Sequence, residues 1–229
     1  DPANGAVRVP LDTNLVIVFD EPVVTGSGDI RIRLTSDNTT VETIPVGDPR
    51  VTGGNTDTIA IDPTSTFASL TGYYVEIDAT AFEDLVGNGY AGIMGPGIWN
   101  FTSADTSVPR PVSLRPADDA VGVALDDALE ITFTEPVNVG SGSITIRLAS
   151  DSSLFDSIPV TDARVTGDGT AIISIAPTST FADSTDYFVL VDSTAFEDFS
   201  DNPYLGIYDA TTWNFTTVDT TSPSLVNLT

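Results

Sequence analysis

The feature that most constrains this chain is an internal repeat with a period of 114 residues. Pro2–Pro109 aligns with Pro116–Pro223 without a gap, and 59 of the 108 aligned pairs are identical. The identical stretches are spread along the whole period, so every loop has the same length in both copies. We therefore expect residues 114 apart to occupy equivalent places in two copies of one module, each with its own core.

The phase of the repeat predicts the domain boundaries. The first module spans residues 1–108 and the second spans residues 109–222. Pro109–Arg115 precedes the second module, and its counterpart Pro223–Thr229 follows the end of that module. We interpret this segment as the opening strand of a module. The first module then lacks its opening strand, residues 223–229 open a following repeat, and the chain is part of an array.

Alternating apolar residues predict that each module is built from β-strands. The alternation is clear at Leu15–Phe19 and Ile30–Leu34, and it recurs 114 residues later, whereas no stretch shows a sustained helical period. At most, Thr80–Asp84 and its counterpart form a helical turn. About seven short strands separated by turn signals in each period predict an all-β fold of two tandem antiparallel β-sandwiches. Tyr73 and Tyr187 each open a late strand, the position of the tyrosine corner in immunoglobulin-like folds.

These residues resemble the bacterial Ig-like domains of the S-layer type, which occur in tandem in large exported proteins. The resemblance covers nearly the whole chain and is carried in the second module by Pro116–Asp119, Val121, Ile131–Val137, Tyr187–Val189, Phe196–Asp198, Asn202 and Trp213–Thr216. It implies a structural, spacer or adhesive role at the bacterial cell surface or outside the cell. It transfers no catalytic residue to this chain.

Charge and composition exclude several classes of function. The chain has eight Arg, no Lys and 33 acidic residues, which gives a net charge of −25. Such a surface repels nucleic acid and anionic membranes, and no apolar run is long enough to insert into a bilayer. Cys and His are absent, which removes thiol nucleophiles, zinc ligands and the commonest general base. Adjacent carboxylates on a turn do not oppose each other across a sugar ring as in a glycosidase. We therefore expect no enzymatic activity.

Two acidic groups are candidate Ca²⁺ sites, because Ca²⁺ takes six to eight oxygen ligands and short acidic loops supply them. The alternative for these loop residues is that they are solvated turn formers. The first group consists of Glu83, Asp84 and Asn88 in the first module and Glu197, Asp198, Asp201 and Asn202 in the second.

The second acidic group lies where one module follows another. Asp105 and Asp219 come directly after the last strand of a module, and Asp118 and Asp119 lie in the opening of the next. A shared divalent cation would offset the repulsion between these carboxylates and stiffen the joint. The alternative is a plain solvated linker.

The gapless duplication favours a structural array, such as the stalk of an adhesin, an S-layer or an extracellular fibre. An unpaired edge strand is a template for another strand, so we expect the terminal strands to pair with neighbouring repeats or identical chains. The rival interpretation is a carbohydrate-binding accessory module of a secreted enzyme. It requires exposed aromatic residues on a concave face, and the candidates are Tyr90, Trp99, Tyr204, Tyr208 and Trp213. For Trp99 and Trp213, however, the strand pattern around them favours a place in the core or in an end cap.

Overall fold

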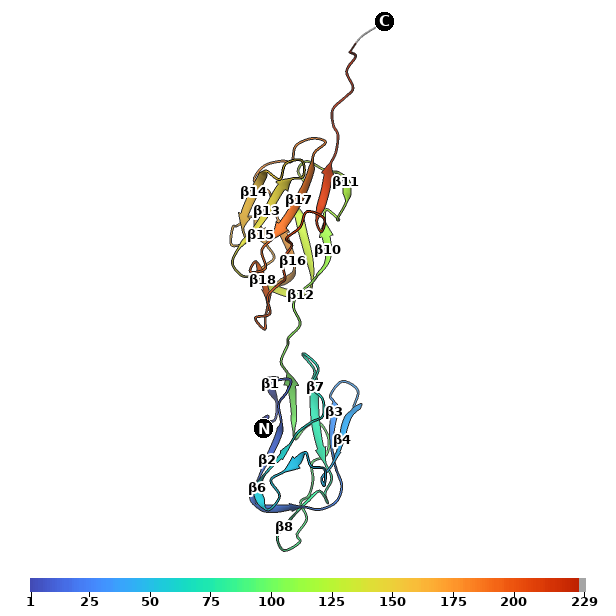
Figure 1. Cartoon of the computed structure of the whole chain (residues 1–229), viewed down its shortest axis with the longest axis vertical. Coiled ribbons are helices and arrows are strands. Elements are labelled where there is room, and N and C mark those ends of the chain that lie inside the picture. The colour runs from blue at the N-terminus through green and yellow to red at the C-terminus, as the bar shows by residue number, and fades with distance from the viewer. Residues whose placement is uncertain (227–229) are drawn as a thin grey trace. The chain divides into compact units, whose positions relative to one another are not determined.

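The structure of the protein is a computed structural model that describes residues 1–226 (Figure 1). In this range the chain is all β, with 19 strands, and it contains no helix that could span a membrane. The chain divides into two compact units, Asp1–Thr106 and a second unit that begins at Ser107. We call them the first and second modules.

The first module is a sandwich of two sheets. The larger sheet has the order β1 (Ala6–Val9), β9 (Asn100–Ser103), β7 (Gly72–Ile77), β3 (Asp29–Leu34) and β4 (Thr40–Pro45), and the smaller has the order β5 (Val51–Thr52), β6 (Thr56–Ile61), β2 (Leu15–Thr25) and β8 (Phe82–Asp84). All neighbours are antiparallel except β1 and β9, which are parallel.

The second module repeats this topology with one additional strand. Its larger sheet has the order β11 (Ala120–Val123), β19 (Asn214–Thr217), β17 (Asp186–Val191), β13 (Ser143–Leu148) and β14 (Leu154–Pro159). The other sheet has the order β10 (Pro111–Arg115), β12 (Leu129–Val139), β16 (Thr170–Ile175) and β15 (Val165–Thr166), and β18 (Phe196–Asp198) also pairs with β12. The predicted all-β fold of two tandem Ig-like sandwiches is confirmed.

Alternation along the strands places the apolar side chains between the two sheets of each module. In β3, Ile30 and Ile32 are buried, whereas Arg31 between them points to the other face, because successive side chains of a strand lie on opposite faces. Ile144 and Ile146 are buried in the same way in β13. Each module therefore has a core of its own, as the repeat predicts.

The predicted tyrosine corner is present in both modules. The backbone N–H of Ala68 donates to the hydroxyl of Tyr73 at 2.9 Å, and Ala182 donates to Tyr187 at 2.9 Å. A second hydroxyl braces each corner, and sequence reasoning did not identify it. In the second module it is that of Thr217, whose counterpart in the first module is a serine.

The helical turn expected at Thr80–Asp84 is wrong. Phe82–Asp84 forms strand β8 and pairs with the end of β2, so that Val23 lies opposite Asp84. Phe82, the apolar residue of this short strand, is fully buried in the core. Pairing with a distant strand and the burial of Phe82 thus override the weak local preference of this short segment for a helical turn.

The opening strand accounts for the additional strand of the second module. In β10, Leu114 pairs with Ile131 of β12 and packs against the core. Among the described residues, the first module has no counterpart of β10. Ile17 is accordingly half-buried, whereas its counterpart Ile131 is fully buried. In the segment expected to open a following repeat, 223–226 belong to no strand, and 227–229 lie outside the described residues.

Candidate functional site

The acidic loop after β8 is held together by the carboxylate of Asp84. One oxygen, Oδ1, accepts hydrogen bonds from the backbone N–H groups of Val86 at 2.9 Å and Asn88 at 2.8 Å. The other, Oδ2, accepts from the side-chain amide of Asn88 at 2.6 Å. These bonds, with that from the Asn88 backbone foremost, hold the pKa of Asp84 below its ordinary value of 3.8. Asp84 therefore closes its own loop.

The loop after β18 has the same construction. The backbone N–H groups of Ser200 and Asn202 donate to Oδ1 of Asp198 at 2.7 and 2.8 Å, and the Asn202 side chain donates to Oδ2 at 2.8 Å. Asp201 adopts a left-handed conformation, with φ 66°, where the first module has Gly87. Asp and Gly both tolerate this region. The turn-forming role considered for these residues is thus present in both copies.

The carboxylates around the first of these loops line a small pocket of about 170 Å³ together with Tyr90. They belong to Asp20, Glu21, Glu83 and Asp84. Among the described residues of either module taken by itself, no three carboxylates bring one oxygen each within 4.8 Å of one another. The calcium site at Glu83, Asp84 and Asn88 and at their counterparts stays a prediction.

Asp118 lies in the loop between β10 and β11, and it ties this loop to β19, the last strand of the second module. Its Oδ1 accepts hydrogen bonds from the backbone N–H and the side-chain amide of Asn214 at 3.1 and 2.9 Å. Asn4 binds Asn100 in the same way in the first module, so the contact does not need a charge. Asp119 is exposed and left-handed, with φ 59°.

The carboxylates that follow the last strand of each module also accept hydrogen bonds from their own module. Asp105 accepts from the hydroxyl of Ser69 at 3.0 Å, and Asp219 accepts from the backbone N–H of Thr221 at 2.9 Å. These contacts order the chain where it leaves each sandwich. A cation shared by these residues with Asp118 and Asp119 stays a prediction.

An arginine in each module clamps three segments together, and sequence reasoning did not identify it. Arg50 forms ion pairs with Asp48 at 3.0 Å and with Glu42, and it also bonds the hydroxyl of Thr64. Glu42 in turn accepts a hydrogen bond from the backbone N–H of Thr64 at 3.0 Å. Burial raises the pKa of Glu42, but the hydrogen bonds from Thr64 and Arg50 outweigh it and hold the pKa below its ordinary value.

The same clamp recurs in the second module around Arg164. This side chain pairs with Asp162 and Asp156, both at 3.1 Å, and bonds the hydroxyl of Thr178. Asp156 replaces a glutamate and keeps the contact with Thr178, whose N–H lies 2.7 Å away. The clamp is therefore retained although one of its acids differs in length.

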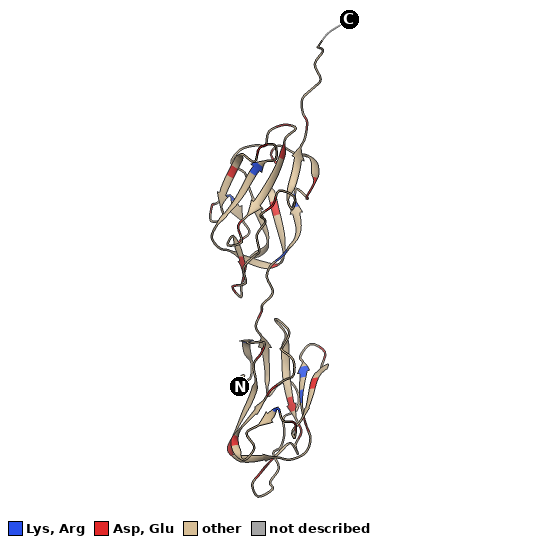
Figure 2. Ribbon diagram, viewed as in Figure 1, with Lys and Arg blue, Asp and Glu red and all other residues tan. Residues whose placement is uncertain are grey.

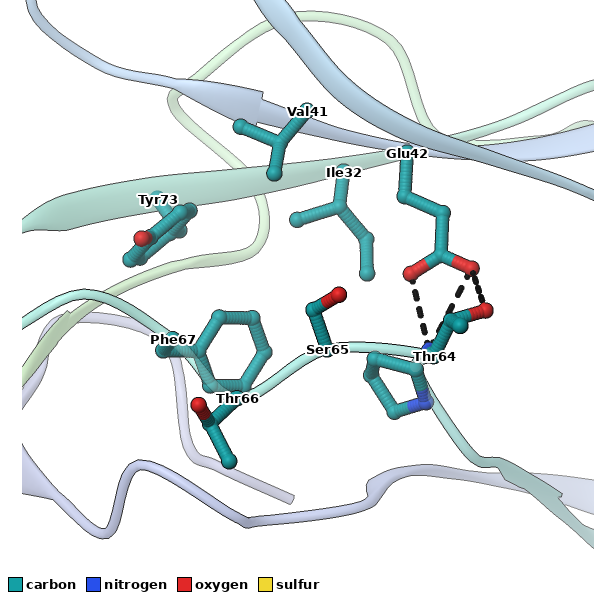
Figure 3. Close-up of a pocket in the computed structure, with 9 residues that line it drawn as sticks. Ile32, Val41, Glu42, Thr64, Ser65, Thr66, Phe67 and Tyr73 are labelled. Atoms are coloured by element: carbon teal, nitrogen blue, oxygen red, sulfur yellow. Dashed lines mark hydrogen bonds between the residues drawn. The ribbon is translucent and has the colours of Figure 1, made fainter.

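Figure 3 shows a pocket of about 280 Å³ beside the clamp of the first module. Val41 lies on one side and Phe67 and Tyr73 on another, while Glu42 and Thr64 hold the rim. The pocket has an apolar wall on the core side and hydroxyl groups along its edge. It is a cavity that the sequence analysis did not predict.

The aromatic residues proposed as a carbohydrate platform are mostly unavailable. Trp99 is 7% exposed and Trp213 is 0% exposed, and their indole N–H groups donate to the carbonyls of Pro2 and Pro116, both at 2.8 Å. Tyr204 is buried as well. The tryptophans therefore belong to the two cores, as the strand pattern around them favours, and they are not available as a carbohydrate-binding surface.

The acidic charge of the molecule is left largely unneutralised. Figure 2 shows Asp and Glu on both modules and few basic residues. Five arginines form ion pairs with acids of their own module: Arg31, Arg33, Arg50, Arg115 and Arg164. The basic residues thus act mainly as internal braces, and the chain keeps a net charge of −25.

Comparison with known families gives one match, to the model described as "Bacterial Ig-like domain". It matches twice, over residues 1–103 and 105–217. No curated protein matches the chain.

Three solved structures to which the chain is similar have low sequence identities and low TM-scores. The BSP domain of a biofilm associated protein is 13% identical with a TM-score of 0.26, and the match covers 96% of this chain and 30% of that one. The I67–I69 fragment of titin is 11% identical with a TM-score of 0.34, covering 96% and 63%. The fibronectin(III)-like modules of Clostridium thermocellum CbhA are 14% identical with a TM-score of 0.24, covering 96% and 91%. The chain thus spans less than two thirds of the length of the first two.

Proposed function

Because the chain belongs to the bacterial Ig-like domain family, we propose that it is a structural repeat of a bacterial surface or extracellular protein. In this role the modules act as spacers in an adhesin stalk, an S-layer or a fibre. Neither module has catalytic activity of its own.

The observation that carries this proposal is that both modules use their polar groups for the same internal purposes. The tyrosine corner, the arginine clamp and the acidic loop occur in both copies with nearly equal distances. Here the polar networks maintain the shape of a module, which is the property that a spacer needs.

A test of location uses bacterial cells that carry the parent protein. Intact cells are treated with a protease that does not enter them, and the modules are followed with an antibody raised against this chain. A surface repeat is cleaved or released under these conditions, whereas a cytoplasmic marker is not. Protection of the modules until the cells are lysed would contradict the proposal.

We also propose that the β2 edge of the first module pairs with a strand from a neighbouring repeat or an identical chain. Its exposed apolar groups support this, because Val18 is 66% exposed and Ile17 is only half-buried. The pairing of β10 with β12 supplies the register. By the repeat, Leu228 of Pro223–Thr229 corresponds to Leu114 and would lie opposite Ile17.

This pairing is tested with a labelled peptide that has the sequence of Pro223–Thr229. It is expected to bind the chain, and the change Leu228→Asp in the peptide is expected to abolish binding, because that side chain would enter the core edge. A peptide of the same composition in scrambled order is the control. Equal binding of the three peptides would refute the proposed register.

We propose that Ca²⁺ in the surrounding medium binds the acidic loops and the junction carboxylates weakly and stiffens the array. The net charge of −25 favours cation accumulation at this surface.

A further inference from the structure

In the second module, an aromatic ring lies at the place that corresponds to the pocket beside Val41. Nine residues line the pocket, and seven of them are identical 114 residues later. The two that differ are Val41, replaced by Phe155, and Glu42, replaced by Asp156. The acid keeps its contact with the threonine in both copies. The replacement of phenylalanine by valine is therefore the difference that leaves the pocket open in the first module.

In the second module, Phe155 packs its ring against two aromatic neighbours. It stacks on Phe181 with the ring centroids 5.3 Å apart and 25° between the planes, and it meets Tyr187 edge to face at 5.1 Å. These are favourable geometries for aromatic pairs. The second module therefore shows how a single six-membered ring fits this place.

The aromatic wall has the same geometry when that ring is missing. Phe67 and Tyr73 have centroids 4.8 Å apart at 52°, and their counterparts Phe181 and Tyr187 have centroids 4.9 Å apart at 55°. The wall thus does not relax into the space that Val41 leaves. This rigidity follows from close packing, because the same rings also contact Phe101 behind them.

The opposite rim is fixed by hydrogen bonds. Glu42 holds the backbone N–H of Thr64 at 3.0 Å and its hydroxyl at 2.7 Å, and Arg50 holds Glu42. The segment that carries Thr64 to Phe67 is therefore pinned at both ends, by the clamp and by the core. Val41 itself is 50% exposed, so the pocket is reached from solvent.

We propose that this pocket of the first module binds a single-ring aromatic group, such as a phenol or a phenylalanine side chain. The ring would take the place that Phe155 occupies in the second module and pack against Phe67 and Tyr73. Preformed walls lower the cost of binding, since little has to be ordered when the ring enters. The inference does not depend on the proposed surface location of the chain.

The test follows methyl groups of the intact chain by NMR during titration with p-cresol. Aromatic rings shift nearby methyl signals strongly, so the signals of Ile32 and Val41 are expected to move in a saturable way. Those of Ile146, the counterpart of Ile32, are expected to stay unchanged. Acetyl-Ala-Phe-Ala-amide as a second probe shows whether a ring on a peptide is taken as well as a free one, and cyclohexanol is the aliphatic control.

Two variants make the outcome decisive. Val41→Phe fills the pocket from within and is expected to weaken p-cresol binding by about tenfold or more, while Phe155→Val is expected to create a second site that shifts Ile146. Correct folding of each variant is checked from methyl signals of its own module that lie away from the pocket, such as those of Ile30 for Val41→Phe and Ile144 for Phe155→Val. The proposal is overturned if Ile32 does not respond to p-cresol, if Val41→Phe binds as well as the wild type, or if cyclohexanol binds equally.

Discussion

The second hydroxyl of the tyrosine corner gives the sharpest stability prediction. Thr217 is 3% exposed, and its hydroxyl accepts a hydrogen bond from the backbone N–H of Thr185 at 2.9 Å. It donates toward the carbonyls of Ala182 at 2.7 Å and Thr185 at 3.1 Å. The change Thr217→Val keeps the shape of the side chain and removes only these bonds.

The magnitude follows from the partners that are left behind. One N–H and at least one carbonyl lose their partner in a largely enclosed place, and each such group costs on the order of 1 kcal/mol or more. We expect Thr217→Val to lower the free energy of unfolding of the second module by about 2 kcal/mol. For a domain of this size that corresponds to roughly 8 °C in Tm. Thr217→Ser keeps the hydroxyl, as Ser103 does in the first module, and is expected to cost at least about 1 kcal/mol less.

The assay is urea unfolding followed by tryptophan fluorescence. Each module contains one of the two tryptophans, so Trp99→Phe leaves Trp213 as the only reporter and isolates the second module. Thr217→Val and Thr217→Ser are compared in this background. If their free energies of unfolding agree within about 0.5 kcal/mol, the hydroxyl contributes nothing and the reasoning is refuted.

Three further predictions concern charge, metal and backbone. Asp84→Asn is expected to lower Tm at neutral pH. Because the folded pKa of Asp84 lies below 3.8, the stabilisation is complete above that pH and lost as the pH falls through the folded pKa. The difference in Tm between wild type and variant should therefore shrink below about pH 3.8, and a constant difference would contradict the assignment. EDTA is expected to lower Tm by several degrees if Ca²⁺ binds the acidic loops, and an unchanged Tm would leave these residues as turn formers alone. Gly167→Ala is expected to destabilise the second module by more than about 1 kcal/mol, because φ of Gly167 is +104° and the added Cβ would lie 1.9 Å from the carbonyl oxygen of Ile172. Circular dichroism during thermal unfolding measures the change in Tm. A Tm equal to that of the wild type would contradict the left-handed conformation of Gly167.

The sequence was sufficient to predict the features that repeat along the chain. Apolar alternation such as that of Ile30 and Ile32 predicts the strands and the faces they bury, because a strand has a fixed period of two. The tyrosine corner at Tyr73 was predictable from its place at the start of a late strand. Local patterns failed at Phe82, where pairing with a distant strand decides the conformation.

The clamp and the pocket were not predictable in the same way, because their members are brought together only by the fold. Arg50 meets Glu42 and Thr64 across turns, and no sequence motif marks this combination. The pocket had one signal that was available. Alignment of the two copies sets Val41 against Phe155, and seven of the eight other residues that line the pocket are identical. A large-to-small change at a core edge predicts a cavity.

The central claim is that residues 114 apart occupy equivalent places in two separately cored modules. Native-state hydrogen exchange of the intact chain tests it, with Ile30→Ala compared against its counterpart Ile144→Ala. Both side chains are fully buried, so each change is expected to cost about 2–5 kcal/mol, or at least about thirtyfold in protection. The account predicts that Ile144→Ala exposes amides from β11 to β19 and leaves β1 to β9 unchanged, and that Ile30→Ala does the reverse at matching positions. Loss of protection in both modules from either single change would contradict it.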